Sequence, residues 1–287
     1  MSGIYWLASY PKSGNTWLRA LLTNYRRDSD TPASINDLDG GWTASLRETF
    51  DELAGIDSAD LTRTQIEHYR PLVYARLAAS SSGPLFLKIH DAFAHNADAQ
   101  AIFPKHATAG VIYLIRNPLD VAVSYAHHRN EPVDDTIRVM GRDDAMLAGA
   151  DTSGEQLPQR LLSWSSHVRS WVDEPGFNIH IVRYEDMVRQ PVDVFAHIVR
   201  FAQLPVDPRR VQRAVEFSSF SELQSQEAVQ GFAERQPTAV SFFRHGRVGS
   251  WSAGLTDLQV RRLIADHHEV MRRFKYLSPS DEILCGE

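Results

Sequence analysis

Residues 10–17 have types and a spacing that suit the binding of an anion. The segment has the sequence YPKSGNTW and leads directly into an expected helix. Free backbone N–H groups at a helix N-terminus bind phosphate, and Lys12 adds a full positive charge. Gly14 lets the backbone approach a ligand closely, and Ser13 and Thr16 bring hydroxyl groups. The pattern predicts a phosphate-binding loop, and an ordinary turn between strand and helix is the plain alternative. It is not a Walker A loop, because Lys12 precedes Gly14.

Arg116 is a second residue placed to bind a phosphate. Residues 114–125 have the sequence LIRNPLDVAVSY, which puts Arg116 at the end of an apolar run. Ligands of open parallel sheets bind at the C-terminal ends of the strands, and a guanidinium binds phosphate through two N–H groups. Asn117 and Pro118 predict the start of a helix, from which Ser124 adds a hydroxyl group. The alternative is a capped helix that carries a surface arginine.

His90 is the candidate general base. Residues 85–91 have the sequence LFLKIHD, so His90 ends an apolar run and Lys88 lies two residues before it. Residues two apart in a strand share a face, so both side chains can address one reacting centre. The chain has twelve histidines, so the position at a strand end, and not the residue type, selects His90. Neither an HExxH pattern nor a Cys/His cluster is present, so we expect no metal.

In chain order, these segments resemble the cytosolic-type sulfotransferases, which use 3′-phosphoadenosine 5′-phosphosulfate (PAPS) as donor. Residues 10–17 are similar to the 5′-phosphosulfate loop of that family, with Asn15 where Thr is usual. Residues 114–125 resemble its 3′-phosphate motif. Residues 242–251, with the sequence FFRHGRVGSW, resemble a late loop that closes over the 3′-phosphate, with His245 in place of Lys.

The resemblance, which spans residues 4–251, implies the groups that bind the donor and the groups that catalyse transfer. His90 is then the general base, and Lys12 and Lys88 assist at the reacting centre. The family often has Pro two residues after this histidine, where the present chain has Ala92. The implied donor-binding residues are Lys12, Ser13, Gly14, Asn15, Thr16, Trp17, Arg116, Ser124, Tyr184, Ser219, Phe220, Arg244, His245 and Gly246.

The elements that must position these residues follow from the apolar pattern. Continuous apolar runs predict buried parallel strands over residues 4–9, 85–90, 110–116 and 178–183. Helical patterns cover residues 15–27, 118–128, 159–172, 191–203, 208–216 and 256–274. The alternation of strands and helices predicts a three-layer αβα fold of the α/β class, with a central parallel sheet between two layers of helices. The resemblance implies the P-loop NTPase-like sulfotransferase fold. We expect a single domain over residues 1–287, with acceptor-side insertions of surface helices and loops over about 28–84 and 129–158.

The composition of the 287 residues is that of a globular protein, with 43% hydrophobic and 23% charged residues. The net charge of −6 argues against a surface that binds nucleic acid by bulk charge. Cys285 is the one cysteine and cannot form an internal disulfide. The N-terminus lacks the pattern of a signal peptide, and no apolar run approaches the roughly 18–20 residues of a membrane span. We therefore expect a cytoplasmic protein.

These expectations define one function and two alternatives. The function is transfer of a sulfuryl group from PAPS to a hydroxyl of a small-molecule acceptor, with His90 as base and adenosine 3′,5′-bisphosphate (PAP) as product. The alternatives are a P-loop-type kinase that uses ATP and a non-catalytic nucleotide-binding module. The acceptor can be a phenol, sterol, alcohol, glycan or natural product. The oligomeric state is open, with a homodimer as one of the states to test.

Overall fold

The computed structural model describes residues 3–41, 43–148, 154–235, 239–244 and 246–284. Cys285 and His245 lie outside the described residues. The contacts of the chain divide it into two compact units. The first unit comprises Met1–Tyr10, Gly40–Tyr113 and Arg142–Ile181. The second unit comprises Pro11–Asp39, Leu114–Gly141 and Val182–Glu287. The single domain expected from the sequence stays a prediction.

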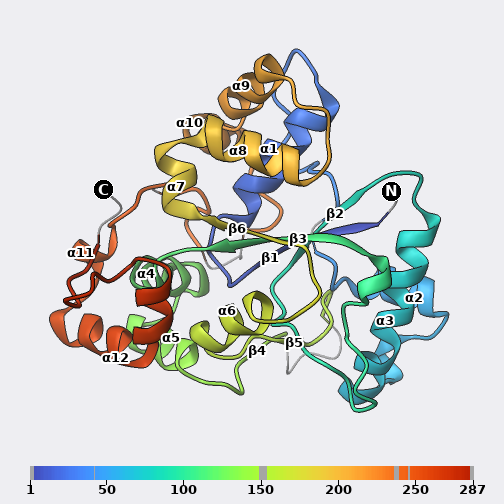
Figure 1. Cartoon of the computed structure of the whole chain (residues 1–287), viewed down its shortest axis with the longest axis horizontal. Helices are drawn as coiled ribbons and strands as arrows, with labels where there is room; N and C mark the ends of the chain where they lie inside the picture. Colours follow the sequence, from blue (N-terminus) through green and yellow to red (C-terminus); the bar gives the residue numbers. More distant parts are fainter. Residues whose placement is uncertain (1–2, 42, 149–153, 236–238, 245, 285–287) are drawn as a thin grey trace. The chain divides into compact units, whose positions relative to one another are not determined.

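A four-stranded sheet is formed in the order β2-β1-β3-β6, and lies largely in the first unit (Figure 1). Its strands are β1 (Ile4–Ser9), β2 (Leu85–Ile89), β3 (Thr108–Ile115) and β6 (Ile179–Arg183). Strands β1 and β2 run parallel, with Ile4 opposite Leu85 and Ala8 opposite Ile89. All six residues of β1 are buried, as expected for a sheet covered on both faces. The predicted α/β class with a central parallel sheet is confirmed.

The strand bounds differ from the predictions by at most two residues. The first predicted strand is reproduced in full, whereas β2 ends at Ile89 and β3 ends at Ile115. His90 and Arg116 therefore each lie one residue beyond a strand. Since strand alternation no longer applies at His90, the argument that it shares a face with Lys88 loses its basis.

The first unit carries two helices in the segment between β1 and β2 that the sequence pattern did not resolve, α2 (Arg47–Ala54) and α3 (Arg63–Ser80). Thr62 and Gln65 form a capping box at the start of α3. Tyr74 of α3 is buried and lies with its ring 5.0 Å from that of Trp6 in β1. Although residues 28–84 were expected to be surface elaborations, α3 is thus part of the core.

The helix predicted over residues 159–172 is shorter than expected. Helix α6 spans Trp164–Val172, and Gln159–Arg160 instead form β5, which pairs with β4 (Met146–Leu147). The Ser163 hydroxyl accepts a hydrogen bond from the Ser166 N–H and so caps α6. The apolar pattern alone could not separate the strand from the helix that follows it.

The second unit is mainly helical. Its helices are α1 (Asn15–Arg27), α4 (Pro118–Arg129), α5 (Val133–Met140), α7 (Tyr184–Arg189), α8 (Pro191–Phe201), α9 (Pro208–Phe217), α10 (Phe220–Gln230), α11 (Trp251–Gly254) and α12 (Asp257–Arg273). Helices α1, α8 and α9 pack together, and α4 packs against α5, α11 and α12 (Figure 1). The predicted helices over residues 15–27, 118–128, 191–203, 208–216 and 256–274 are all found, with ends that move by at most two residues.

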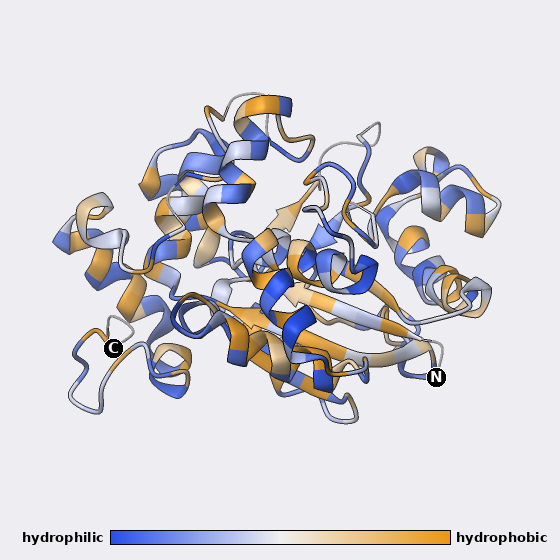
Figure 2. Cartoon of the chain, turned by 90° about the horizontal axis from the view of Figure 1, so that it is seen from above, coloured by the Kyte–Doolittle hydropathy of each residue, from blue (hydrophilic) through white to orange (hydrophobic). Residues whose placement is uncertain are grey.

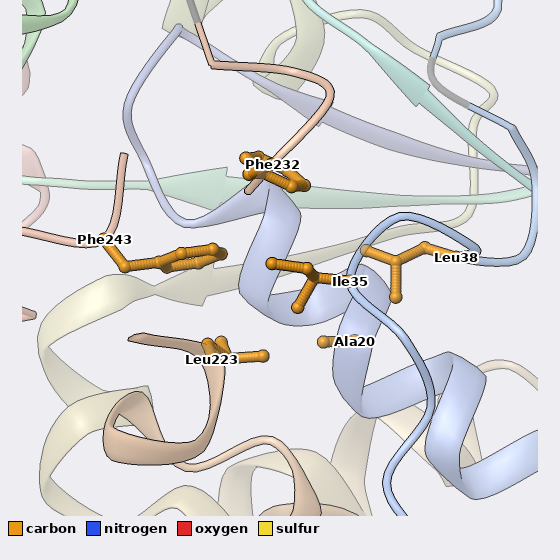
Figure 3. Close-up of a cluster of buried hydrophobic side chains, with 6 residues drawn as sticks. All are labelled: Ala20, Ile35, Leu38, Leu223, Phe232 and Phe243. Atoms are coloured by element: carbon orange, nitrogen blue, oxygen red, sulfur yellow. The ribbon is translucent and has the colours of Figure 1, made fainter. Parts of the chain in front are cut away.

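Apolar side chains join α1 and α10 in the core of the second unit (Figure 3). This buried cluster consists of Ala20, Ile35, Leu38, Leu223, Phe232 and Phe243. In the whole chain the strands are mostly hydrophobic, whereas many helices alternate between hydrophobic and hydrophilic residues (Figure 2). Burial of such surface stabilises the fold by about 25 cal/mol per Å².

No helix in the described part of the chain combines the length and the apolar character that a membrane crossing requires.

Candidate active site

The loop before α1 has the backbone of an anion cradle. Lys12 and Gly14 both have positive φ values, 68° and 101°. An added Cβ at Gly14 would lie 2.7 Å from Cδ2 of Tyr184, so both the conformation and the space require glycine. No described side chain caps α1, and its first turn carries no acidic residue. The positive end of the α1 dipole therefore meets no described acidic side chain in this turn, which favours an anion there.

Ser13 has a buried hydroxyl that can hydrogen-bond to a phosphate oxygen. The residue is 1% exposed, and its Oγ has no hydrogen-bond partner among the described residues. A buried hydroxyl without a partner costs about 1–3 kcal/mol, which a phosphate oxygen would recover. Asn15 and Thr16 are also buried beside it, in the first turn of α1. These residues fit the 5′-phosphosulfate group predicted from the sequence.

Arg116 ties two loops of the second unit together. Its Nη1 donates to the carbonyl of Lys12 at 3.0 Å, and its Nη2 donates to the carbonyl of Arg247 at 3.2 Å. Its guanidinium lies over the Tyr184 ring, 4.3 Å from the centroid. No described group accepts from its buried Nε. The sequence predicted that Arg116 binds a phosphate. The structure adds a second role for Arg116, which is to hold the loop over residues 10–17, called the phosphate loop below.

Two aromatic side chains that the resemblance implies as donor-binding residues, Trp17 and Tyr184, lie close together near Gly14. The rings of Trp17 and Tyr184 lie 6.0 Å apart in an edge-on arrangement. The Trp17 Nε1 donates to the carbonyl of Ser218 at 2.9 Å, which fixes the indole. Burial raises the pKa of Tyr184, so its hydroxyl stays neutral. Both residues lie where the phosphate loop turns into α1.

Ser219 and Phe220 lie at the start of α10 and have structural contacts there. The Ser219 hydroxyl accepts from the Glu222 N–H at 3.4 Å and caps the helix. Phe220 covers Gly246, whose φ is 58° and whose added Cβ would lie 2.3 Å from the Phe220 ring. The Phe220 ring, which the resemblance places near the nucleotide, therefore leaves no space for a side chain at position 246.

The loop over residues 242–251 is anchored by two buried carboxylates, Glu227 and Asp120, which were not predicted from the sequence. Glu227 of α10 accepts from the N–H groups of Phe242 and Phe243 at 2.7 and 2.8 Å. At the other end of the loop, Asp120 of α4 accepts from the N–H groups of Gly249 and Trp251 at 2.9 and 3.0 Å. The backbone on both sides of Arg244 is therefore held by charge-assisted hydrogen bonds.

Three more of the predicted donor-binding residues in the second unit are Arg244, Ser124 and Lys12. Arg244 and Ser124 are half-buried. The ammonium of Lys12 lies over the Phe242 ring, 3.9 Å from its centroid. This cation–π contact links the phosphate loop to the start of the 242–251 loop.

His90 belongs to the first unit and has a defined tautomer. Its Nδ1 lies 2.8 Å from the carbonyl oxygen of Ser9, the last residue of β1, and 3.4 Å from the hydroxyl of the same serine. A carbonyl oxygen can only accept, so Nδ1 carries the proton and Nε2 is the basic nitrogen. This is the protonation state that a base acting through Nε2 requires.

A buried ion pair fixes the chain directly after His90. Asp91 is 2% exposed and accepts from Nη1 and Nη2 of Arg70 at 2.7 and 2.9 Å. Ser45 donates to the same carboxylate at 3.1 Å, and the indole of Trp171 donates to the Asp91 carbonyl at 2.8 Å. Burial alone would lower the pKa of Arg70, but the charges and hydrogen bonds of Asp91 and Tyr74 together outweigh it and raise that pKa. These contacts shape the loop in which the resembled family often has proline.

Lys88 is buried, with 8% of its surface exposed. Its carbonyl accepts from the Ala44 N–H at 2.8 Å, which joins the end of β2 to the segment before α2. The assignment of its side chain to catalysis stays a prediction. Among the described residues, no group of three or more His, Cys, Asp or Glu side chains could hold a metal ion.

The fold and the sequence are both similar to known sulfotransferases. The structure of mouse sulfotransferase SULT7A1 complexed with PAP has a TM-score of 0.61 and 22% identity, over 96% of this chain and 86% of that one. Flavonol 3-sulfotransferase of Flaveria bidentis is 23% identical over 273 residues, which cover 90% of this chain and 78% of the relative. Cytosolic sulfotransferase 10 of Arabidopsis thaliana is 24% identical over 270 residues, 90% of this chain and 74% of the relative.

The sulfotransferase domain family matches residues 4–275, and the chain belongs to this family. The predicted family and the predicted class of enzyme, a sulfotransferase, are confirmed. The kinase alternative is not favoured by this result.

Proposed function

We propose that this chain transfers the sulfuryl group of PAPS to a hydroxyl group of a small-molecule acceptor and releases PAP. The single observation that carries the role of His90 is its hydrogen bond to the Ser9 carbonyl, which assigns the proton to Nδ1 and the basic lone pair to Nε2. A relative named for a flavonol supports a small molecule as acceptor, and a fold neighbour complexed with PAP supports the donor.

In the proposed reaction, Nε2 of His90 accepts the proton of the acceptor hydroxyl while the hydroxyl oxygen forms a new bond to sulfur. The bond between sulfur and the 5′-phosphate oxygen breaks, and its electron pair stays on that oxygen. An alcohol or phenol is a weak nucleophile while it keeps its proton, so a positioned base speeds this step by about 10²–10⁴.

The phosphate loop stabilises the charge that develops on the 5′-phosphate oxygen. Lys12 contributes its ammonium, Ser13 its buried hydroxyl, and the first turn of α1 its N–H groups. We assign Arg116 and Arg244 to the 3′-phosphate, which PAPS carries and ATP lacks.

The other predicted residues complete this assignment. Ser124 adds a hydroxyl at the 3′-phosphate, Trp17 and Tyr184 contact the adenine, and Lys88 assists at the sulfuryl group. Asn15, Thr16, Ser219, Phe220, His245 and Gly246 complete the donor-binding set.

His90→Ala tests the catalytic role. We expect turnover to fall by about 10²–10⁴, because the base is lost, while PAP binding and the melting temperature stay close to those of the wild type. His106→Ala is the matched control, since His106 is an exposed histidine between β2 and β3. Turnover would be followed by transfer of radiolabelled sulfate from PAPS to a panel of phenols, sterols and alcohols. Full activity of His90→Ala would remove His90 from the mechanism.

A thermal-shift comparison tests the donor. PAP should raise the melting temperature more than ATP with Mg²⁺, because only PAP has the 3′-phosphate. Equal stabilisation by the two nucleotides would contradict the assignment of the 3′-phosphate ligands. A chain that binds PAP but transfers no sulfate to any acceptor would be the non-catalytic binding module.

We also propose that residues 28–84 and 129–158 take part in selecting the acceptor, since they lie outside the donor motifs. A cytoplasmic location is supported by the relative named a cytosolic sulfotransferase. Exchange of residues 129–158 with those of a relative should change the preferred acceptor and leave PAP affinity unchanged.

A further inference from the structure

His167 is a fully buried histidine with a defined partner on each ring nitrogen. It lies on α6 in the first unit and has no exposed surface. Its Nε2 is 3.1 Å from the carbonyl oxygen of His90, and its Nδ1 is 2.8 Å from the hydroxyl of Tyr113 in β3. Nothing in the proposed reaction so far uses this side chain.

The two partners fix the tautomer of His167. The His90 carbonyl can only accept, so Nε2 of His167 carries the proton and donates it. Nδ1 then accepts from the Tyr113 hydroxyl. Burial lowers the pKa of His167 to about 4 and raises that of Tyr113 well above its usual value. Both groups are therefore neutral at pH 7, and the direction of both hydrogen bonds is set.

His167 also packs against the segment that orients the His90 ring. Its ring lies edge-on to that of Tyr10, with the centroids 5.5 Å apart. Tyr10 directly follows Ser9, whose carbonyl accepts from Nδ1 of His90. One side chain thus contacts the main chain of His90 and the residue next to its hydrogen-bond acceptor.

We propose that His167 is a positioning residue for the general base: it holds the His90 main chain and the Ser9–Tyr10 segment in the relative placement that keeps Nε2 of His90 basic and directed at the acceptor. The inference rests on the proposed function, because it concerns how His90 performs its role. His167 does not touch the reacting atoms. Its effect is large because a displacement of about 1 Å in a catalytic group can cost about 10²-fold in rate.

Two amide substitutions separate positioning from packing. In His167→Gln the side-chain amide reaches about as far as Nε2 of histidine and can still donate to the His90 carbonyl. In His167→Asn it reaches only about as far as Nδ1, so the carbonyl of His90 loses its donor. We expect turnover to fall by about 10²-fold in His167→Asn and to recover most of the wild-type value in His167→Gln. His106→Gln, at an exposed site between β2 and β3, is the matched control.

The readouts separate this inference from the proposed function. The ¹⁵N chemical shifts of the His90 ring report its tautomer without any acceptor, and should show a protonated Nδ1 in the wild type and His167→Gln but a mixture in His167→Asn. Isothermal titration with PAP should give similar affinities for all variants. Turnover is measured with 2-naphthol and the other acceptors of the panel.

The inference is wrong if His167→Asn keeps the wild-type turnover and tautomer, or if both amide variants lose turnover equally at equal melting temperature. Should His167→Asn fail to fold, Tyr113→Phe decides, since it removes only the hydroxyl that orients His167. It should shift the His90 tautomer in the same direction, and an unchanged tautomer would overturn the inference. A wild-type chain that binds no PAP or transfers no sulfate would instead refute the proposed function.

Discussion

Acid should destabilise this protein through the buried side chain of His167. An exposed histidine has a pKa of 6.5, whereas burial lowers the pKa of His167 to about 4. Between these two values the unfolded chain binds a proton at this site and the folded chain does not. The free energy of unfolding must therefore fall as the pH is lowered from above 6.5 towards 4.

The size of the effect follows from the same difference. The fall of the pKa from 6.5 to about 4 gives a contribution of about 3 kcal/mol, which is present at pH 7 and lost near pH 4. Because the total stability of a domain is typically about 5–15 kcal/mol, this one group would remove a large share of it.

Urea unfolding of the wild type and of His167→Gln, followed by tryptophan fluorescence at several pH values from 7 to 4, measures this contribution. The glutamine does not titrate, so the difference in stability between the two proteins isolates His167 from all other groups. We expect the wild type to lose about 3 kcal/mol relative to the variant over this range. Parallel curves would show that His167 is protonated at its ordinary pKa in the folded protein, and would refute the reasoning.

Three further predictions concern other buried contacts. Gly14→Ala should destabilise the fold by about 1–3 kcal/mol in urea and weaken PAP binding, because the positive φ of residue 14 and the Tyr184 ring exclude a side chain. An alanine variant with normal PAP affinity would contradict this prediction. Asp91→Asn should lower the free energy of unfolding by about 3–5 kcal/mol, since the charge of Arg70 stays buried without its partner. Replacement of both Asp91 and Arg70 by apolar residues should restore most of the stability. Equal losses of stability in the single and double variants would disprove this prediction. Glu227→Gln should weaken PAP binding by about tenfold but leave 5′-AMP affinity unchanged in titration calorimetry, because Glu227 anchors the loop that carries the predicted 3′-phosphate ligands. Equal weakening of the binding of both nucleotides would count against that role.

Where short-range physical rules suffice, the sequence predicted the structure well. The run from Ile4 to Ala8 is hydrophobic at every position, as a strand covered on both faces requires, and β1 has the predicted bounds Ile4–Ser9. Asn117 and Pro118 predicted the start of α4, and the Asn117 side chain accepts from the Leu119 N–H as expected of an N-cap. The same rules failed for α3, whose weakly segregated apolar face gives little periodic signal although Tyr74 is buried.

By itself, then, the sequence determined the class of fold. It also predicted the phosphate-binding loop after the first strand and selected His90 among twelve histidines as the candidate base. Only the tertiary structure decided which nitrogen of His90 carries the proton. That choice depends on the carbonyl of Ser9, 81 positions away, and is supported by His167, 77 positions away. The loop after His90 is shaped by Arg70, through an ion pair that no local pattern announces. Hydrogen bonds and buried ion pairs of this kind join groups that packing brings together, and their partners cannot be found from spacing along the chain.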